Sequence, residues 1–447
     1  MNRVFIKTYG CQMNERDSEE VASSLIERGY SLVENEKEAD IVLLNTCSVR
    51  EQAESKAIGK AGHVLSKKKK DKKFILGILG CMAQNKGADL LKSLPKLSLI
   101  AGTQKFHHIP DYLDTLTKQD SKNKLPIVDL DEEANSQNHI KNHLDSSSKT
   151  VSAFVSIMQG CNMNCSFCIV PKTRGNERYR AMDEIVAEVE TLARNGVKEV
   201  TLLGQIVNAY GRGEFARIDN KSPFVQLLDK LHAIDDIKRI RFTSPHPVAF
   251  GDDLIAAFTR LNKLGSHAHI PVQSGSDRIL KSMNRPYTRS KFIDLVKKLR
   301  ASNPEMRLST DVIVGYPGEQ EEDFEATKDL FVEAGFEMAF IFKYSERSGT
   351  PAAELSDQVP QRVKEKRNQE LLHLLEQQST VSNEKLVGSN VEVLVEGKAR
   401  KGEGFLIGRT PCFRKVIFLG SDKLISNIVA VRIARISPNT LFGDLIT

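Results

Sequence analysis

Near its middle the chain reads Cys161-Asn-Met-Asn-Cys165-Ser-Phe-Cys168, directly after the strand-like run Ala153–Met158 and the turn residues Gln159-Gly160. Three thiolates this close together would repel one another unless they bound a metal. A structural zinc ion normally takes four protein ligands, and no fourth cysteine or histidine lies nearby in the sequence. Three cysteines suit a 4Fe–4S cluster whose open iron could chelate S-adenosylmethionine. A zinc knuckle is the alternative interpretation.

The region around this motif, from about Thr150 to Gln378, repeats a strand-then-helix pattern about six times. The expected strands are Ala153–Met158, Glu199–Leu203, Arg239–Phe242, His267–Val272, Leu308–Val314 and Met338–Tyr344. Six units are fewer than the eight of a closed barrel, so we expect a partial, open (β/α)6 barrel. The functional site should lie at the carboxyl ends of its strands, where the cysteine motif begins.

The first part of the chain alternates apolar strand-like runs with helical stretches, which predicts a small parallel α/β sheet. The runs are Val4–Lys7, Ile41–Leu44 and Phe74–Leu79. Each run is followed within a few residues by a cysteine, namely Cys11, Cys47 and Cys81. Loops at the carboxyl ends of parallel strands converge on one crevice, so these cysteines are expected to hold a second cluster. Taken singly, each could instead be a small buried side chain, which is our interpretation of the isolated Cys412.

Changes in composition divide the chain further. Ser, Asn, Asp, Lys and Gln dominate from about Gln119 to Lys149, which predicts a linker. After a charged amphipathic helix near Pro360–Leu386, short β-rich runs with Gly and Asn turns predict a small β-barrel. The expected organisation is an α/β domain over 1–118, a linker over 119–146, the barrel core over 147–378 and the small β-barrel over 380–445.

Composition limits the class of protein. A length of 447 residues predicts roughly three domains. No stretch approaches the run of about 18 apolar residues that a membrane helix needs. A strand-like run begins at Val4 and leaves no room for a signal peptide, so we expect a cytoplasmic protein. Seven cysteines are then unlikely to form disulfides, which favours metal binding. A net charge of +6 permits a nucleic-acid partner.

Several motifs resemble those of the radical S-adenosylmethionine methylthiotransferases, and the resemblance covers nearly the whole chain. In the first domain they are Thr8-Tyr9-Gly10-Cys11-Gln12-Met13-Asn14-Glu15, Asn45-Thr46-Cys47-Ser48-Val49-Arg50 and Gly80-Cys81-Met82-Ala83-Gln84. The tetrad Cys11–Asn14 is the main basis for predicting the substrate. It favours the branch that modifies dimethylallyladenosine in transfer RNA (tRNA) over the branches that modify a ribosomal-protein aspartate or threonylcarbamoyl-adenosine.

The resemblance implies two 4Fe–4S clusters and two molecules of S-adenosylmethionine. Cys11, Cys47 and Cys81 would hold the auxiliary cluster, and Cys161, Cys165 and Cys168 the radical-generating one. One S-adenosylmethionine would methylate a sulfur at the auxiliary cluster, while a radical from the other removes the C2 hydrogen of N6-(dimethylallyl)adenosine at position 37. An electron donor and a sulfur donor are implied, and a monomer is expected. A non-catalytic iron–sulfur or zinc RNA-binding protein is the rival from a different class.

The barrel strands end in further motifs that resemble the family, at 201–205, 242–247, 271–275 and 311–318. The candidate cofactor-binding residues taken from them and from the cysteine motif are Phe167, Gly204, Gln205, Thr243, Ser244, Gln273 and Asp311. Each of the strand-end residues could instead be an ordinary turn residue of the barrel. His246 and His269 are expected to be structural.

The tail resembles the TRAM domain, a small RNA-binding β-barrel. Its candidate phosphate contacts are Lys398, Arg400, Lys401, Arg409, Arg414 and Lys415, although each could simply be a solvated basic residue. The Lys67–Lys70 run, with Lys72 and Lys73, is interpreted as a solvated loop. The expected partner is the anticodon stem-loop, whose single-stranded adenine can be splayed into the mouth of the barrel.

Overall fold

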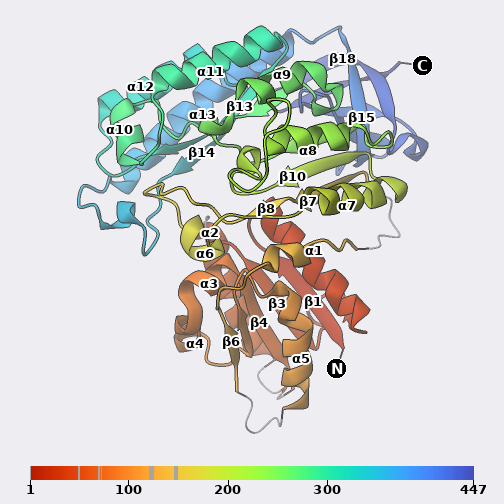
Figure 1. Cartoon of the computed structure of the whole chain (residues 1–447), viewed down its shortest axis with the longest axis vertical. Coiled ribbons are helices and arrows are strands. Elements are labelled where there is room, and N and C mark those ends of the chain that lie inside the picture. The colour runs from red at the N-terminus through yellow and green to blue at the C-terminus, as the bar shows by residue number, and fades with distance from the viewer. Residues whose placement is uncertain are drawn as a thin grey trace.

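The computed structural model describes residues 2–48, 51–68, 71, 73–119, 125–144 and 150–446. Val49 and Arg50 of the second cysteine motif, and Lys69, Lys70 and Lys72 of the lysine run, lie outside these residues. Figure 1 shows an N-terminal α/β unit below the central barrel, and the C-terminal β-barrel beside the far end of the central one.

The N-terminal unit is built on a parallel sheet of order β2-β1-β3-β4-β5-β6. Its strands are β1 (Arg3–Thr8), β2 (Ser31–Leu32), β3 (Ile41–Thr46), β4 (Ile75–Gly80), β5 (Leu99–Ala101) and β6 (Ile127–Asp129). Its helices are α1 (Gln12–Glu27), α2 (Glu51–Lys67), α3 (Cys81–Lys86), α4 (Leu90–Ser93) and α5 (Ile109–Lys118). Every residue of β3 and β4 is buried, because helices cover both faces, and this explains their continuous apolar sequences. The expected parallel α/β domain is confirmed.

The sixth strand comes from the segment expected to be a linker. β6 pairs in parallel with β5, and Gly102 N donates a hydrogen bond to Asp129 O at 2.8 Å. The residue after β6, Leu130, is held in place because the Gln84 side chain donates a hydrogen bond to its backbone O at 2.8 Å. A three-residue strand is too short to show an alternating pattern, so only its pairing with the sheet reveals it.

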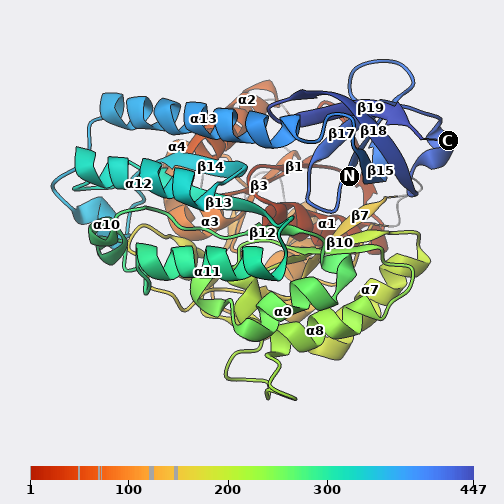
Figure 2. The same ribbon diagram turned by 90° about the horizontal axis from the view of Figure 1, so that it is seen from above.

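The central unit has the six strands expected of a partial barrel, arranged as two parallel sheets, β11-β10-β7 and β12-β13-β14. The strands are β7 (Ser152–Ser156), β10 (Glu199–Leu203), β11 (Arg239–Phe242), β12 (His267–His269), β13 (Arg307–Val314) and β14 (Met338–Lys343), with a small hairpin of β8 (Met158–Gln159) and β9 (Arg178–Tyr179). β12 is shorter than expected. Figure 2 shows the helices surrounding these strands on the outside.

Those helices bury apolar stripes against the sheets and form the largest hydrophobic core of the protein. They are α6 (Val170–Arg174), α7 (Met182–Arg194), α8 (Pro223–His232), α9 (Asp252–Arg260), α10 (Asp277–Ser282), α11 (Arg289–Ser302), α12 (Glu321–Ala334) and α13 (Gln361–Glu384). The long α13 lies along β14 and leads to the C-terminal unit (Figure 2).

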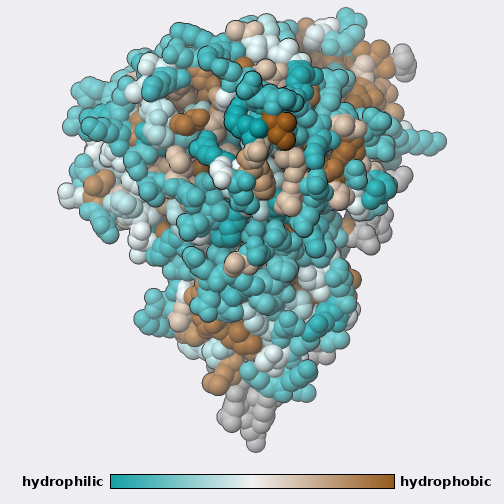
Figure 3. Space-filling view, viewed as in Figure 1, coloured by the Kyte–Doolittle hydropathy of each residue, from teal (hydrophilic) through white to brown (hydrophobic). Residues whose placement is uncertain are grey.

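The C-terminal unit is a closed barrel of order β15-β16-β17-β19-β18, as expected of a small β-barrel. Its strands are β15 (Asn390–Lys398), β16 (Phe405–Arg409), β17 (Lys415–Leu419), β18 (Ile428–Ser437) and β19 (Thr440–Leu445), the last of which was not anticipated. Figure 3 shows a predominantly hydrophilic surface on the face that it draws. In the part of the chain that the structure describes, no helix is long and apolar enough to cross a membrane.

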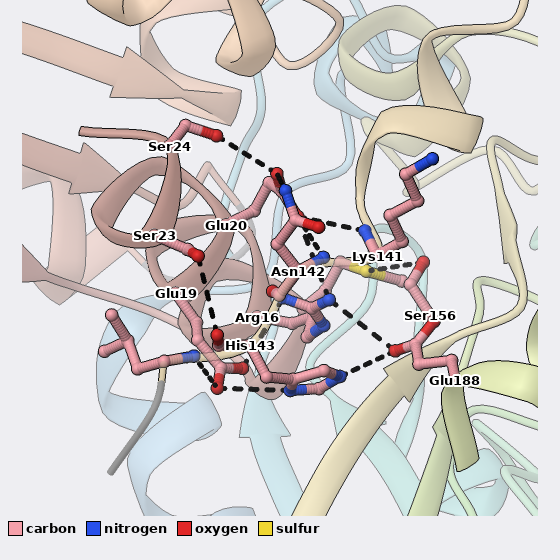
Figure 4. Close-up of polar contacts among 12 residues, drawn as sticks. Arg16, Glu19, Glu20, Ser23, Ser24, Lys141, Asn142, His143, Ser156 and Glu188 are labelled. Atoms are coloured by element: carbon pink, nitrogen blue, oxygen red, sulfur yellow. Dashed lines mark hydrogen bonds and ion pairs between the residues drawn. The ribbon is translucent and has the colours of Figure 1, made fainter. Parts of the chain in front are cut away.

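A buried polar network joins the N-terminal unit to the central barrel (Figure 4). The His143 ring lies between Glu19 of α1, 3.1 Å from Nδ1, and Glu188 of α7, 2.6 Å from Nε2. Glu188 also pairs with Arg16 of α1 at 3.6 Å and with Arg180 at 2.6 Å. Residues 141–144, from the expected linker, therefore dock between the two units.

This network predicts a pH-dependent stability. Burial lowers the pKa of His143, but its hydrogen bonds to Glu188 and Glu19 outweigh burial, so the pKa is raised overall. The pKa of each glutamate is lowered, so both remain charged near neutral pH. The stabilisation from protonated His143 is therefore complete below its unfolded pKa of about 6.5 and is lost as the pH rises through the folded pKa.

We expect His143→Gln to lower the thermal unfolding midpoint more at pH 6 than at pH 9. Differential scanning fluorimetry of both proteins at the two pH values would measure this, and an equal decrease at both would contradict it. His373, an exposed histidine on α13, is a suitable site for the matched control His373→Gln.

Candidate functional site

Three cysteines meet at the carboxyl edge of the N-terminal sheet. Cys11 follows β1, Cys47 follows β3, and Cys81 is the first residue of α3 after β4. We call them the auxiliary triad. Gly10, with φ +133°, allows the loops to approach, because a Cβ there would lie 3.2 Å from the Cys47 Sγ atom and still closer to its Cβ. The structure thus brings together the three cysteines that the sequence pointed to.

The thiols of this triad interact with one another. A hydrogen bond with Cys47 lowers the pKa of Cys11 to about 5, against the opposing effect of burial. Burial raises the pKa of Cys81. Asn14 accepts a long contact of 3.5 Å from the Cys11 Sγ atom and is held in place by Asn45 of β3, whose Nδ2 donates to Asn14 O at 2.9 Å.

A cation from the central barrel reaches this triad. Arg174 ends α6, six positions after Cys168 (168 to 174), and only 4% of its side chain is exposed. Its Nη2 pairs with the fully buried Asp17 of α1 at 2.7 Å, and its charge acts on both Cys11 and Cys81. Its Nη1 is buried and makes no hydrogen bond within the described residues. Sequence reasoning did not identify Arg174, because no local pattern connects it with cysteines of another domain.

The second triad, Cys161, Cys165 and Cys168, lies on the loop after β7 and β8, at the carboxyl end of the barrel strands. We call it the barrel triad. Burial, together with the neighbouring thiols, raises the pKa of Cys161 to about 11 and that of Cys168 to about 12. Arg285 donates a hydrogen bond from Nη1 to the Cys165 Sγ atom at 3.2 Å, which places a second unanticipated arginine beside a cysteine.

The spacing of the sulfur atoms argues against a single metal ion. All six cysteines belong to the described residues, yet neither triad brings its three Sγ atoms within 4.8 Å of one another. Tetrahedral zinc, with Zn–S bonds of about 2.3 Å, would need sulfur atoms closer together than that. A cluster of several irons is larger than a single ion and therefore suits thiolates that are more widely spaced. The buried, unpartnered Nη1 of Arg174 is further suited to a sulfide of such a cluster.

The candidate cofactor-binding residues surround the same mouth of the barrel. Gly204 and Gln205 follow β10, and the Oε1 atom of Gln205 is buried without a hydrogen-bond partner among the described residues. Thr243 and Ser244 follow β11, and Ser244 adopts a left-handed conformation with φ +56°. Gln273 does the same at φ +72°. Left-handed backbone at non-glycine residues is uncommon and clusters at ligand sites.

The other two candidates differ in their setting. Phe167, between two cysteines of the barrel triad, packs against an apolar cluster that includes Tyr316 and Ile313. Asp311 lies in the middle of β13 rather than at its end, and its Oδ2 is 3.4 Å from His269 Nε2. Both histidines expected to be structural have partners within the protein. His246 accepts a hydrogen bond from Val248 N through Nδ1, and His269 Nδ1 lies 2.9 Å from Ser309 Oγ.

Three of the six candidate RNA contacts pair with other side chains of the protein. Lys398 does so at the exposed surface, with Asp422 at 2.7 Å, whereas Arg409 and Arg414 are more enclosed. Arg414 pairs with Glu337 and donates from Nε to Asn383 Oδ1 at 2.9 Å, with 11% of its side chain exposed. Arg409 pairs with Glu396 at 3.0 Å, and its guanidinium lies 4.3 Å from the Phe413 ring. Both therefore depart from the expectation of free phosphate-binding side chains.

The side chains of Arg409 and Arg414 are engaged because the 410–414 loop docks on the amino ends of the barrel strands. The Arg241 guanidinium of β11 lies 4.4 Å from the centroid of the Phe413 ring, and the His267 ring of β12 stacks on the same phenylalanine at 5.3 Å between ring centroids. Arg307, the first residue of β13, donates to Phe413 O at 3.3 Å. These contacts fix the small barrel against the central one. Lys398, Arg400 and Lys401 are exposed, and Lys415 is half-buried.

One compact group of metal-ligating side chains occurs in the described part of the chain, formed by His107, His108 and Glu133. Lys105 Nζ lies 3.0 Å from Glu133 Oε2 and 3.5 Å from Asp129 Oδ1. The ammonium group of Lys105 already balances the charge of the Glu133 carboxylate. We therefore interpret the group as an ion-pair network.

Comparison with known families matches three parts of the chain. The Radical SAM superfamily matches residues 155–331, the Uncharacterized protein family UPF0004 residues 3–102, and the TRAM domain residues 384–446. The three matches fall on the central barrel, the N-terminal sheet and the closed C-terminal barrel, respectively.

Curated relatives extend over nearly the whole length. The chain is 56% identical to the tRNA-2-methylthio-N(6)-dimethylallyladenosine synthase of Opitutus terrae, covering 100% of this chain and 98% of that protein. It is 51% identical to the synthase of the same name from Methylacidiphilum infernorum, covering 99% and 94%. The chain belongs to the tRNA-2-methylthio-N(6)-dimethylallyladenosine synthase family. A further synthase of this family, from Akkermansia muciniphila, is 46% identical over 99% of this chain and 98% of that protein.

Solved structures show the same fold at low identity. The radical S-adenosylmethionine methyltransferase TsrM from Kitasatospora setae superposes with a TM-score of 0.58 at 11% identity, covering 79% of this chain and 75% of that one. Another structure of TsrM, with cobalamin and a 4Fe–4S cluster bound, gives 0.57 at 12% identity, covering 79% and 74%. Membership of the synthase family makes this chain a radical S-adenosylmethionine enzyme that uses 4Fe–4S clusters.

Proposed function

We propose that this enzyme transfers a methylthio group to C2 of N6-(dimethylallyl)adenosine at position 37 of tRNA. The observation that carries the proposal is the arrangement of two separate cysteine triads joined by α6, which begins beside Cys168 and ends with Arg174 against the other triad. The shared name of the relatives supports the substrate, and it does not favour a ribosomal protein or threonylcarbamoyl-adenosine.

In this proposal the auxiliary triad and the barrel triad each hold one cluster. When bound, the clusters and two S-adenosylmethionine molecules would supply the radical, the methyl group and the sulfur. The chain's own residues bind and orient these groups. Gln205 Oε1 would accept a hydrogen bond from the S-adenosylmethionine beside the barrel triad, with Gly204, Thr243, Ser244, Gln273, Asp311 and Phe167 forming the rest of its surroundings. Arg285 and Arg174 place positive charge beside the anionic thiolates.

The small β-barrel would hold the anticodon stem-loop through Lys398, Arg400, Lys401 and Lys415, whose side chains are exposed or half-buried. A monomer acting in the cytoplasm, supplied by a separate electron donor and sulfur donor, completes the proposal. Arg409 and Arg414 are left out of the RNA-binding set because their guanidinium groups have partners within the protein. Arg414 holds the small barrel against the central one, and Arg409 pairs with Glu396 of the small barrel itself.

Nucleoside mass spectrometry of tRNA from cells with and without the gene would test this function. We expect cells that lack it to lose the 2-methylthio nucleoside and to accumulate N6-(dimethylallyl)adenosine. The intact gene should restore the modification, whereas a copy carrying Cys165→Ala should not. Unchanged 2-methylthio nucleoside in the deletion strain would overturn the substrate assignment.

A further inference from the structure

Two exposed phenylalanines lie side by side on the last strand of the central barrel. Phe340 and Phe342 of β14 are 47% and 36% exposed, whereas Ala339 and Ile341 of the same strand are partly buried. Their ring centroids are 6.4 Å apart and the rings are nearly parallel, at 17°. Together they expose an aromatic surface, which we call the aromatic ledge.

The ledge faces away from the helices that cover the barrel. Alternate residues of a strand point to opposite faces. Ala339 and Ile341 pack against the hydrophobic core, and Lys343 pairs with Glu365 of α13. Phe340 and Phe342 must therefore lie on the opposite face, which is the inner face of the open barrel.

The inner face is the side where the site lies. Phe340 pairs in register with Asp311, and its ring meets the His269 ring edge-on at 6.2 Å. Phe342 pairs with Ile313, which packs in the same apolar cluster as Phe167 of the cysteine loop. The ledge thus runs from Asp311 toward the barrel triad.

β14 also borders the opening of the barrel. It is hydrogen-bonded to β13 on one side, and no other described strand pairs with its other edge. In Figure 1 it lies beneath α12 and α13, on the side of the barrel that faces the N-terminal unit, which carries the auxiliary triad. A flat group that rests on the ledge would lie on the inner face of the barrel, near its open edge.

We propose that Phe340 and Phe342 form the platform on which the target adenine stacks, with its N6-isoprenoid group covering the second ring. The proposal rests on the proposed function and assigns it two positioning residues. A nucleobase taken from a single-stranded loop loses its stacking partners, and aromatic side chains replace them. An apolar ledge of two rings suits a prenylated purine better than the aspartate of a ribosomal protein, because a carboxylate would be desolvated there without a partner.

The test compares two anticodon stem-loop RNAs, one carrying N6-(dimethylallyl)adenosine at the target position and one abasic there. Their dissociation constants are measured with the holoenzyme, and their ratio isolates the contribution of the target base. In the native enzyme we expect the abasic RNA to bind about tenfold more weakly or worse, since stacking on an aromatic side chain has that effect. In Phe340→Leu/Phe342→Leu the ratio should fall to near one.

Two variants provide controls with matched chemistry. Phe340→Tyr/Phe342→Tyr keeps the aromatic faces and should keep the native ratio. Phe405→Leu changes an equally exposed phenylalanine (38%) on the small barrel and should leave the ratio unchanged, whatever it does to overall affinity. Equal iron content in all variants would show that the proteins are folded and loaded.

The outcomes separate the ledge from the function. A native ratio in the double leucine variant would overturn the ledge and leave the proposed function intact. A fall in the ratio in the tyrosine variant as well would also overturn it, because stacking does not distinguish the two rings so strongly. A native enzyme that binds neither RNA would count against the tRNA substrate and the ledge together.

Discussion

Cys165→Ala is expected to abolish both cleavage of S-adenosylmethionine to 5′-deoxyadenosine and methylthio transfer. Cys165 lies at the centre of the barrel triad and interacts with both Cys161 and Cys168, as well as with Arg285 at 3.2 Å. Two remaining thiolates cannot hold a cluster that requires three. Iron content, and 5′-deoxyadenosine formed after reduction, would be measured on anaerobically reconstituted protein, and we expect loss of one cluster and a product level at background.

The auxiliary triad provides a contrasting variant. Cys81→Ala should also lose one cluster and all methylthio transfer, yet it should still form 5′-deoxyadenosine, because the barrel triad is intact. Cys412→Ala is the matched control: Cys412 lies on the loop of the small barrel, outside both triads, and both activities should persist. Retention of two clusters in either triad variant would refute the assignment of its cysteine as a ligand.

Arg174→Leu is expected to have the largest effect on stability. Arg174 and Asp17 form an ion pair at 2.7 Å with side chains 4% and 0% exposed, and removal of one member leaves the other buried without compensation. Such a loss costs about 3–5 kcal/mol. The auxiliary triad would also lose its positive neighbour, so we expect lower iron occupancy there and a shift of that cluster to a lower reduction potential. Thermal unfolding, iron analysis and a potentiometric titration followed by electron paramagnetic resonance would measure these effects.

A second substitution separates the two roles of Arg174. In Arg174→Leu/Asp17→Asn the uncompensated carboxylate is gone, so much of the stability should return. The potential of the auxiliary cluster should remain low, because the positive charge beside it is still missing. Recovery of the native potential in the double variant would show that Arg174 acts only through the fold.

Local sequence accounts well for the strands that carry the cysteines. β3 and β4 are buried on both faces, and their continuous apolar runs identify them without any tertiary information. The strand boundaries Glu199–Leu203 and Arg239–Phe242 are also confirmed. The three-residue β6 was missed, since its place in the sheet depends on pairing with β5 and not on a periodic pattern.

By itself the sequence determined the six cysteines, their division into two groups of three, the single loop that holds one group and the parallel strands that bring the other together. These features depend on spacing along the chain and on the common direction of parallel strands. Only the tertiary structure decided that Arg174 reaches the auxiliary triad, that Arg414 holds the small barrel against the central one, and that Phe340 and Phe342 face the interior. Each of these depends on contacts between segments far apart in the chain, and the energy of such contacts is set by how the units dock, which no short stretch of sequence encodes.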